Sequence, residues 1–326
     1  MKFLGFVLLL LLIVAAAAGF LVYVPYGPSS ETFVDIAPGT GTRGIAAQLA
    51  AAGVIRSEYA FDALKMAKGG RLKAGEYRFD HAAPLQEVYA RIVKGDVYTR
   101  TVVIPEGYNI FDIAAAVEAA GLGNRADFLA AERSNTQLIS QVSPGASSLE
   151  GFLFPDTYKF SRHASMADML AVMVRRWASM TNTMHLAQNR DVTRTVIMAS
   201  LIEKEVKADS ERPMVAGVFE NRLAKGMPLQ TDPSVIYAAL LDKRWRGTIY
   251  ASDLQADSPY NTYKHAGLPP GPICNPGIAA LRAAMVPTVT DNLYFVSDAA
   301  GHSVFASDLK QHGENVRAYR AATGKQ

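Results

Sequence analysis

The first 24 residues place a strict limit on how this chain can fold. From Phe3 to Val24 no residue carries a charge, and nothing polar marks a solvent-facing side. As a helix this segment would be about 33 Å long, enough to cross the hydrocarbon core of a bilayer. A core helix would need a polar face, so we predict a transmembrane helix within residues 1–25.

A cleavable signal peptide is the alternative for the same segment. Its apolar region is typically about 7–15 residues, although Ala15–Gly19 offers small residues where a peptidase could cut. We favour an uncleaved signal anchor. Lys2 precedes the span and Arg43 is the first basic residue after it, which indicates a short cytoplasmic N-terminus. We therefore predict a single-pass protein of the inner (plasma) membrane, with its body on the periplasmic, extracytoplasmic side.

Composition excludes several classes of function. The 33 basic and 30 acidic residues are interspersed and give a net charge of only +3, so no basic run for nucleic acid is present. The six histidines are scattered without a His-Glu-x-x-His motif, and we expect no metal and no cofactor. Cys274 lies in a proline-rich loop rather than at a helix N-terminus that would activate a thiol.

A weak repeat organises the first third of the 326-residue chain. Ile45–Val54 resembles Ile113–Leu122, and each copy follows a β-like run and a proline-containing turn. Between the copies, Ser57 is the expected cap of a helix that ends at Lys68, Ala74–Asp80 alternates like a strand, and Leu85–Lys94 is again helical. Strand, two helices, strand is the order of a LysM module, which binds N-acetylglucosamine chains. We predict a LysM-like βααβ subdomain at residues 31–98; the alternative is a spacer without carbohydrate affinity.

The remainder reads as mostly helical, which makes the predicted fold class α+β. The expected helices are Met166–Met180, Arg194–Ala208, a third from a cap at Asp209 or Ser210 to Gly226, and two that begin with Asp232-Pro233 and Asn275-Pro276 as cap plus proline. Asn292–Ser297 and Gly301–Ala306 are predicted to pair as strands, and Tyr263–Asn275 is a long irregular loop of the kind that often carries function.

One predicted helix carries a carboxylate on its apolar side. At 100° per residue, Glu205 projects between Met198 and Leu201, whereas Glu203 sits at the edge of the stripe. A carboxyl against apolar side chains has a raised pKa, which suits it to deliver a proton near neutral pH. The alternative is a rim carboxylate whose head pairs with Arg212.

The segments around this helix resemble the YceG-like endolytic murein transglycosylases. The similar blocks are Glu150–Tyr158, Ala199–Tyr237 with Glu-Lys-Glu at 203–205 and Gln-Thr-Asp-Pro at 230–233, Tyr260–Tyr263, Gly267–Gly271 and Asn275–Leu281. The resemblance implies a lysozyme-like catalytic domain at residues 99–326. It also implies cleavage of the β-1,4 bond between N-acetylmuramic acid and N-acetylglucosamine, leaving a 1,6-anhydro end. The family's catalytic glutamate corresponds to Glu205.

Other polar residues are candidates for holding the glycan strand. Gln230, Thr231 and Asp232 precede a helix N-terminus, where they would reach sugar hydroxyl or acetamido groups; simple capping also explains Asp232. Tyr260, Asn261 and Tyr263 offer stacking surface and amide contacts, although packing tyrosines would look the same. Glu150 and Asp156 flank an aromatic run and would line the groove, with a turn as the alternative for Asp156.

These residues favour an enzyme that needs only one carboxyl group. Ordinary glycosidases use two, whereas a lytic transglycosylase lets the 6-hydroxyl of the sugar attack its own anomeric carbon. We predict a membrane-bound enzyme that cuts nascent strands, sets their length and works beside a penicillin-binding synthase, which the resemblance implies as partner. The alternatives are a non-catalytic peptidoglycan-binding or divisome scaffold and a hydrolytic muramidase.

The N-terminal segment gives a direct test. If Phe3–Val24 stays uncleaved, the mature protein retains Met1 or Lys2 and remains with membranes after a carbonate wash, because a spanning helix is not released by high pH. Sequencing of the mature N-terminus checks this. A start near Gly19 or Phe20 would identify a cleaved signal instead.

Overall fold

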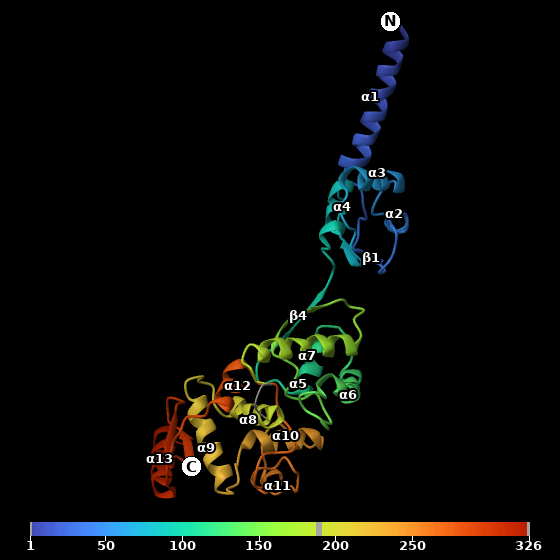
Figure 1. The fold of residues 1–326 in the computed structure, drawn as a ribbon. Helices are drawn as coiled ribbons and strands as arrows, with labels where there is room; N and C mark the ends of the chain where they lie inside the picture. Colours follow the sequence, from blue (N-terminus) through green and yellow to red (C-terminus); the bar gives the residue numbers. More distant parts are fainter. Residues whose placement is uncertain (1, 187–190, 325–326) are drawn as a thin grey trace. The chain divides into compact units, whose positions relative to one another are not determined.

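The computed structural model describes residues 2–186 and 191–324, which form two compact units, Met1–Arg100 and Thr101–Gln326, in a mixed α+β fold (Figure 1). The elements of the first unit are α1 (Lys2–Tyr23), β1 (Thr32–Ile36), α2 (Thr42–Ala51), α3 (Glu58–Lys68), β2 (Gly75–Phe79) and α4 (Leu85–Lys94).

The first unit has the predicted order of strand, two helices and strand. β1 and β2 pair antiparallel, with Thr32 opposite Phe79 and Ile36 opposite Gly75. The Ser57 side chain accepts a hydrogen bond from the backbone N–H of Ala60, as expected of the cap of α3. A core built around Phe61 and other buried side chains joins the helices to the sheet. The identity of this unit as a carbohydrate-binding module stays a prediction.

Helix α1 is the one described helix long and apolar enough to cross a membrane. Its Phe3–Tyr23 stretch has a mean hydropathy of 2.9, and none of it is buried inside the protein. A signal sequence would share both properties, so length and composition alone do not distinguish an anchor from a leader.

The second unit is mainly helical. Its elements are β3 (Arg100–Ile104), α5 (Ile110–Ala119), α6 (Arg125–Ser134), the 3₁₀ turn η1 (Thr136–Ile139), β4 (Asp156–Phe160), α7 (Met166–Asn182), α8 (Val192–Glu205), α9 (Arg212–Ala224), α10 (Asp232–Leu241), α11 (Ala251–Leu254), α12 (Ile278–Met285), β5 (Tyr294–Ser297), β6 (Ser303–Ala306) and α13 (Leu309–Thr323). β3 pairs with β4, and β5 pairs antiparallel with β6 as predicted.

Helix α8 is the central element of the second unit. Its residues from Thr195 to Ile202 are all buried, and α9, α10 and α12 pack against it. This burial explains why α8 does not show the simple amphipathic pattern of a surface helix. The side chains of α8 therefore have fixed surroundings, and its C-terminal end is held in a defined position.

Several predicted helix boundaries are wrong by a few residues. α8 ends at Glu205 rather than Ala208, because Val206 is already extended. The residue that caps α9 is Glu211, not Asp209 or Ser210.

The two predicted Asx-Pro caps are also wrong. Asp232 is the first residue inside α10, and Thr231 precedes it as the cap. The residue at the cap of α12 is Gly277, two positions after Asn275. The Asn275 side chain is fully buried and accepts a hydrogen bond from the backbone N–H of Leu153 (2.8 Å). A buried polar side chain must be hydrogen-bonded, and this bond takes the place of helix capping.

A glycine inside α9 allows the chain before β5 to lie against that helix. A Cβ atom at Gly217 would stand 2.2 Å from the carbonyl oxygen of Thr288. The close approach is reinforced by Asn221, whose side-chain amide donates to the carbonyl of Thr290 at 2.7 Å. This contact fixes the side of α9 that carries Arg222.

Gly217→Ala should therefore lower the free energy of unfolding by about 1–3 kcal/mol, because the backbone of Thr288 would have to move. Gly313→Ala in α13 is the matched control. Its new methyl group would meet only the Arg317 side chain at 3.7 Å, so it should gain about 0.5–1 kcal/mol from helix propensity. Denaturant titration measures both; equal effects would show that the Thr288 contact is not tight.

Candidate active site around Glu205

The carboxyl group of Glu205 stands at the C-terminal end of α8 without a polar partner. Within the described residues it makes no hydrogen bond and no ion pair, although only part of the side chain is open to solvent. The neighbouring turn of the helix contributes buried Leu201 and Ile202. The alternative in which Glu205 pairs with Arg212 is not what the structure shows.

Its surroundings raise the pKa of Glu205 to about 7. Burial is the main cause, because the charged form loses its hydration. The negative charge of Asp232 raises the pKa further, and the positive charge of Arg222 acts in the opposite direction. A carboxyl group with this pKa exists in both protonation states at neutral pH, which is what a group that first gives and then takes a proton requires.

Glu203, two residues earlier, has the opposite environment. Its Oε2 atom lies 2.7 Å from Nη1 of Arg212 and accepts a hydrogen bond of 2.9 Å from the backbone N–H of Gly277. Both charged side chains are about 95 % buried, at 5 % and 6 % exposure. This carboxylate ties α8 to α9 and to the start of α12, so its role is structural.

Asp232 and Tyr263 come together beside Glu205. The Tyr263 hydroxyl donates a hydrogen bond of 2.7 Å to Oδ1 of Asp232. The negative charge of Asp232 raises the pKa of Glu205, and the negative charge of Glu205 raises the pKa of Tyr263. Asp232 is therefore not occupied as a helix cap, and its carboxylate is exposed. The fold thus brings together two candidate residues, Asp232 and Tyr263, from segments that are distant in the sequence.

Arg222 supplies the positive charge in this group. Its Nε donates to the carbonyl of Leu293 at 2.7 Å and its Nη1 to the carbonyl of Leu229 at 2.8 Å. These bonds hold the guanidinium against the chain that leads into α10. Arg222 could not be identified from the sequence as a site residue, because a basic residue on a helix has no distinguishing pattern.

Gln230 and Thr231 lie in a strained and tightly bonded turn. Gln230 has a φ of 53°, a left-handed value that is uncommon for a residue other than glycine, and its side chain is exposed. Thr231 is buried, and its backbone N–H donates to the hydroxyl of Thr262 at 2.9 Å. Gln230 is placed where it can meet a ligand, whereas Thr231 holds the turn.

The loop residues Tyr260 and Asn261 differ in the same way. Asn261 is fully buried, and its amide donates to the carbonyls of Ala256 (2.8 Å) and Leu254 (3.0 Å), so it stabilises the loop. Tyr260 is partly exposed and packs against Tyr237, with ring centroids 5.1 Å apart.

Glu150 is a buried connector rather than an open groove residue. Its Oε2 accepts from the backbone N–H of Ile110 at 2.9 Å, and its Oε1 accepts from Nδ2 of Asn275 at 2.8 Å. Burial raises its pKa to about 8. Glu150 still borders a cavity of about 270 Å³ that Tyr260 also lines. Asp156 does not form a turn; it begins β4 and lies 2.6 Å from Nε of Arg176.

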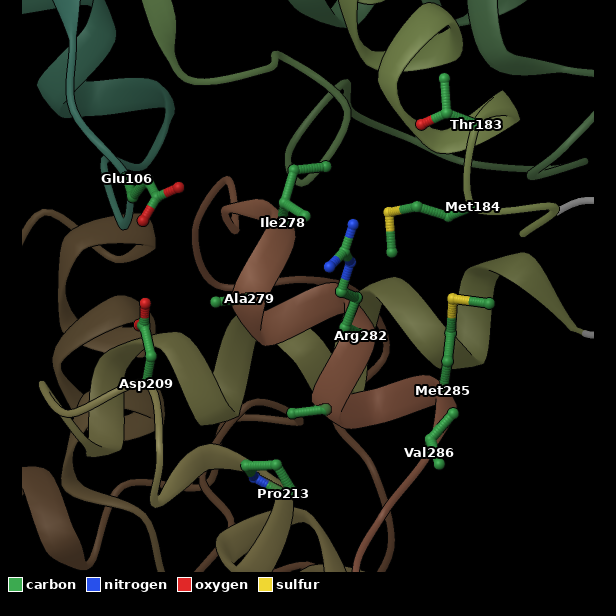
Figure 2. Close-up of a pocket in the computed structure, with 11 residues that line it drawn as sticks. Glu106, Thr183, Met184, Asp209, Pro213, Ile278, Ala279, Arg282, Met285 and Val286 are labelled. Carbon is green, nitrogen blue, oxygen red and sulfur yellow. The ribbon is translucent and has the colours of Figure 1, made fainter.

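A pocket of about 770 Å³ lies near the Glu203–Arg212 pair (Figure 2). Glu106 and Asp209 lie on one side of it, and Arg282 projects between Ile278 and Met184. Glu205 is not among its lining residues, so this pocket and the candidate catalytic carboxyl lie at different places. Burial and the charge of Glu203 raise the pKa of Glu106, which lies in the turn after β3 where no periodic pattern could reveal it.

No group of three or more His, Cys, Asp or Glu side chains in residues 2–186 and 191–324 is arranged to hold a metal ion.

The different environments of the two acids lead to opposite effects on stability. Unfolded Glu205 loses its proton near pH 4.5 and the folded residue near pH 7, so its contribution to stability is lost as the pH rises across that window. Glu205→Gln cannot ionise and should exceed the wild type at pH 8 by on the order of 2 kcal/mol, with the difference shrinking towards pH 4.5.

Glu203→Gln is the matched comparison. It should lower the free energy of unfolding at pH 8 by on the order of 3 kcal/mol, because the buried Arg212 guanidinium loses its buried counter-charge and keeps only the exposed Asp209. Thermal and denaturant unfolding at several pH values measure both variants. Destabilisation by Glu205→Gln at pH 8 would contradict the assignment of Glu205 as the desolvated, unpaired acid.

Known proteins share this arrangement of sequence and fold. The family model described as YceG-like matches residues 34–318. An endolytic murein transglycosylase of Bacillus subtilis is 34% identical over 88% of this chain and 84% of that protein. One of Streptococcus pneumoniae is 30% identical over 90% of this chain, which spans only 59% of that protein's length. The crystal structure of a YceG-like protein from Listeria monocytogenes matches with a TM-score of 0.60 and 31% identity, covering 88% of this chain and 99% of that chain. This chain belongs to the YceG-like family.

Proposed function

We propose that this protein is an endolytic murein transglycosylase that cleaves the bond between N-acetylmuramic acid and N-acetylglucosamine within a glycan strand. Family membership and the names of the curated relatives support the reaction class. The observation that carries the proposal is the partnerless carboxyl of Glu205, with a pKa of about 7, at the end of a helix whose residues from Thr195 to Ile202 are buried.

In this proposal Glu205 acts twice on the same glycosidic bond. Its protonated carboxyl donates to O4 of the leaving N-acetylglucosamine as the bond from the muramic acid C1 to that oxygen breaks. The 6-hydroxyl of the muramic acid then attacks C1, and its proton goes to the Glu205 carboxylate. A 1,6-anhydro ring forms, Glu205 regains its proton, and no water is consumed.

The groups beside Glu205 support this cycle electrostatically. The charge of Asp232 favours the protonated state that begins the reaction, and Arg222 limits the cost of the carboxylate that forms in the middle of it. Opposing influences of this kind keep the pKa near neutrality, where neither state of the carboxyl is trapped.

The exposed side chains near the site are the proposed contacts to sugar. Gln230 and Asp232 are exposed, and Tyr263 and Tyr260 are partly exposed. Thr231, Asn261 and Glu150 act indirectly in this proposal, because their polar atoms already bond to the protein.

The N-terminal helix suggests where the enzyme works. We propose that α1 is an uncleaved anchor, that the catalytic unit lies on the periplasmic, extracytoplasmic side, and that the LysM-like unit contacts the glycan. A tethered enzyme meets strands as they leave the membrane, so it would set their length beside a penicillin-binding synthase.

The activity of matched variants tests the assignment of Glu205. Glu205→Gln keeps the shape of the side chain but has no transferable proton, so cleavage of purified glycan strands should fall by about 10²-fold or more. Glu203→Gln, assayed at a temperature where it stays folded, should have a much smaller effect. Mass spectrometry of the products measures both, and the presence of anhydro ends in the wild-type digest identifies the reaction.

Two results would redirect the proposal. Equal loss of activity in the two variants would mean that the position of Glu205 on α8 does not distinguish it. Intact glycan binding with no cleavage, unchanged by Glu205→Gln, would favour the scaffold role.

A further inference from the structure

We propose that the outer face of α3 lies in the interfacial layer of the same bilayer that α1 crosses, so that the first unit rests on the membrane rather than hanging from a flexible stalk. The inference relies on the anchor proposed above. The lipid headgroup region would cover this face of α3.

A single arginine fastens the end of α1 to the start of α3. The Arg56 guanidinium donates to the carbonyls of Val24 and Pro25, both at 3.1 Å. It also stacks on the rings of Phe20 and Tyr26, at 4.5 and 4.9 Å from their centroids. Val24 and Pro25 directly follow the last residue of α1, so Arg56 holds the chain where it leaves the anchor.

The outer face of α3 exposes large side chains that the unit does not bury. Tyr59 is 87% exposed and Met66 is 88% exposed. They are seven residues apart and therefore share one side of the helix, while Phe61 and Leu64 on the opposite side enter the core. Two large, exposed side chains on one side of a helix form a surface that a second apolar phase can cover.

The position of α3 makes the bilayer the natural cover. α3 contacts α1 and runs across its lower end, between α1 and the β1–β2 sheet (Figure 1). Because Phe61 and Leu64 enter the core of the unit, the opposite side of α3, with Tyr59 and Met66, faces outward beside the end of α1. Tyr23 and Tyr26, 63% and 39% exposed, lie at the same end of α1.

The chemistry of the face fits the interface rather than the hydrocarbon core. Tyrosine is enriched at the headgroup level because its ring is apolar and its hydroxyl is polar. Glu58 and Asp62 lie beside the apolar side chains on α3, so this side of the helix would be too polar for deeper insertion. A protein partner could cover the same face. We favour lipid because α3 contacts α1, which the bilayer already surrounds in this proposal.

Spin labels measure depth directly and suit this chain, because its one cysteine, Cys274, is fully buried. We would introduce Tyr59→Cys, Met66→Cys, Leu11→Cys in α1 and Asp35→Cys in β1, one at a time. Each full-length protein would be placed in vesicles of phosphatidylethanolamine and phosphatidylglycerol. The readout is collision of the label with oxygen, which partitions into lipid, against a nickel chelate, which stays in water.

The expected ratio of oxygen to nickel collisions is highest at position 11, lowest at position 35, and several-fold above the position 35 value at positions 59 and 66. A deep label at 11 with water-like values at 59 and 66 would overturn the inference and leave the anchor intact. A water-like label at 11 would instead overturn the anchor. Low access to both reagents at 59 and 66 would mean that a second copy covers α3, which also contradicts the proposal.

Discussion

The pairing of Arg212 with Glu203 is the interaction on which the site depends. α8 carries two acids near its end, and the buried guanidinium of Arg212 pairs with the first of them, Glu203, at 2.7 Å. Gly277 adds a backbone hydrogen bond to the same oxygen and joins α12 to the pair. Glu205 is left without an ion-pair partner, so burial outweighs the more distant charge of Arg222 and raises the pKa of Glu205 to about 7. A single guanidinium thereby gives Glu203 a structural role and leaves Glu205 unpaired for the proposed chemistry.

A second buried carboxyl holds the surrounding loops in place. Glu150 joins the start of α5 to Asn275, and Asn275 in turn bonds to the backbone of Leu153. These bonds fix the irregular segment between α11 and α12, whose other end carries Tyr263 and its contact to Asp232. The exposed groups near Glu205 are therefore supported by polar residues that are themselves buried. This division of roles explains how a loop rich in proline and glycine can present side chains in fixed positions.

Sequence patterns predicted those features that depend on local periodicity. The helix with Glu205 on its inner side, the β1–α2–α3–β2 order and the β5–β6 pair are all present. The errors arise where a distant contact outweighs local preference. Asn275 has the sequence of a helix cap but is drawn into the core by Glu150, and Asp232 is turned towards Tyr263 instead of capping α10. Arg222 and Glu106 could not be found from sequence, because only the folded chain brings their charges near the two acids of α8.

In the proposed reaction, the Glu205 carboxyl gives and takes every proton that is transferred, and the 6-hydroxyl of the sugar is the nucleophile. Cleavage of glycan strands in oxygen-18 water tests this most directly. The new muramic acid end should carry no heavy oxygen, and its mass should be one water below that of a hydrolysis product. Incorporation of the label at that end would mean that a second carboxylate, with Asp232 the nearest candidate, activates water, and the protein would then be a hydrolytic muramidase.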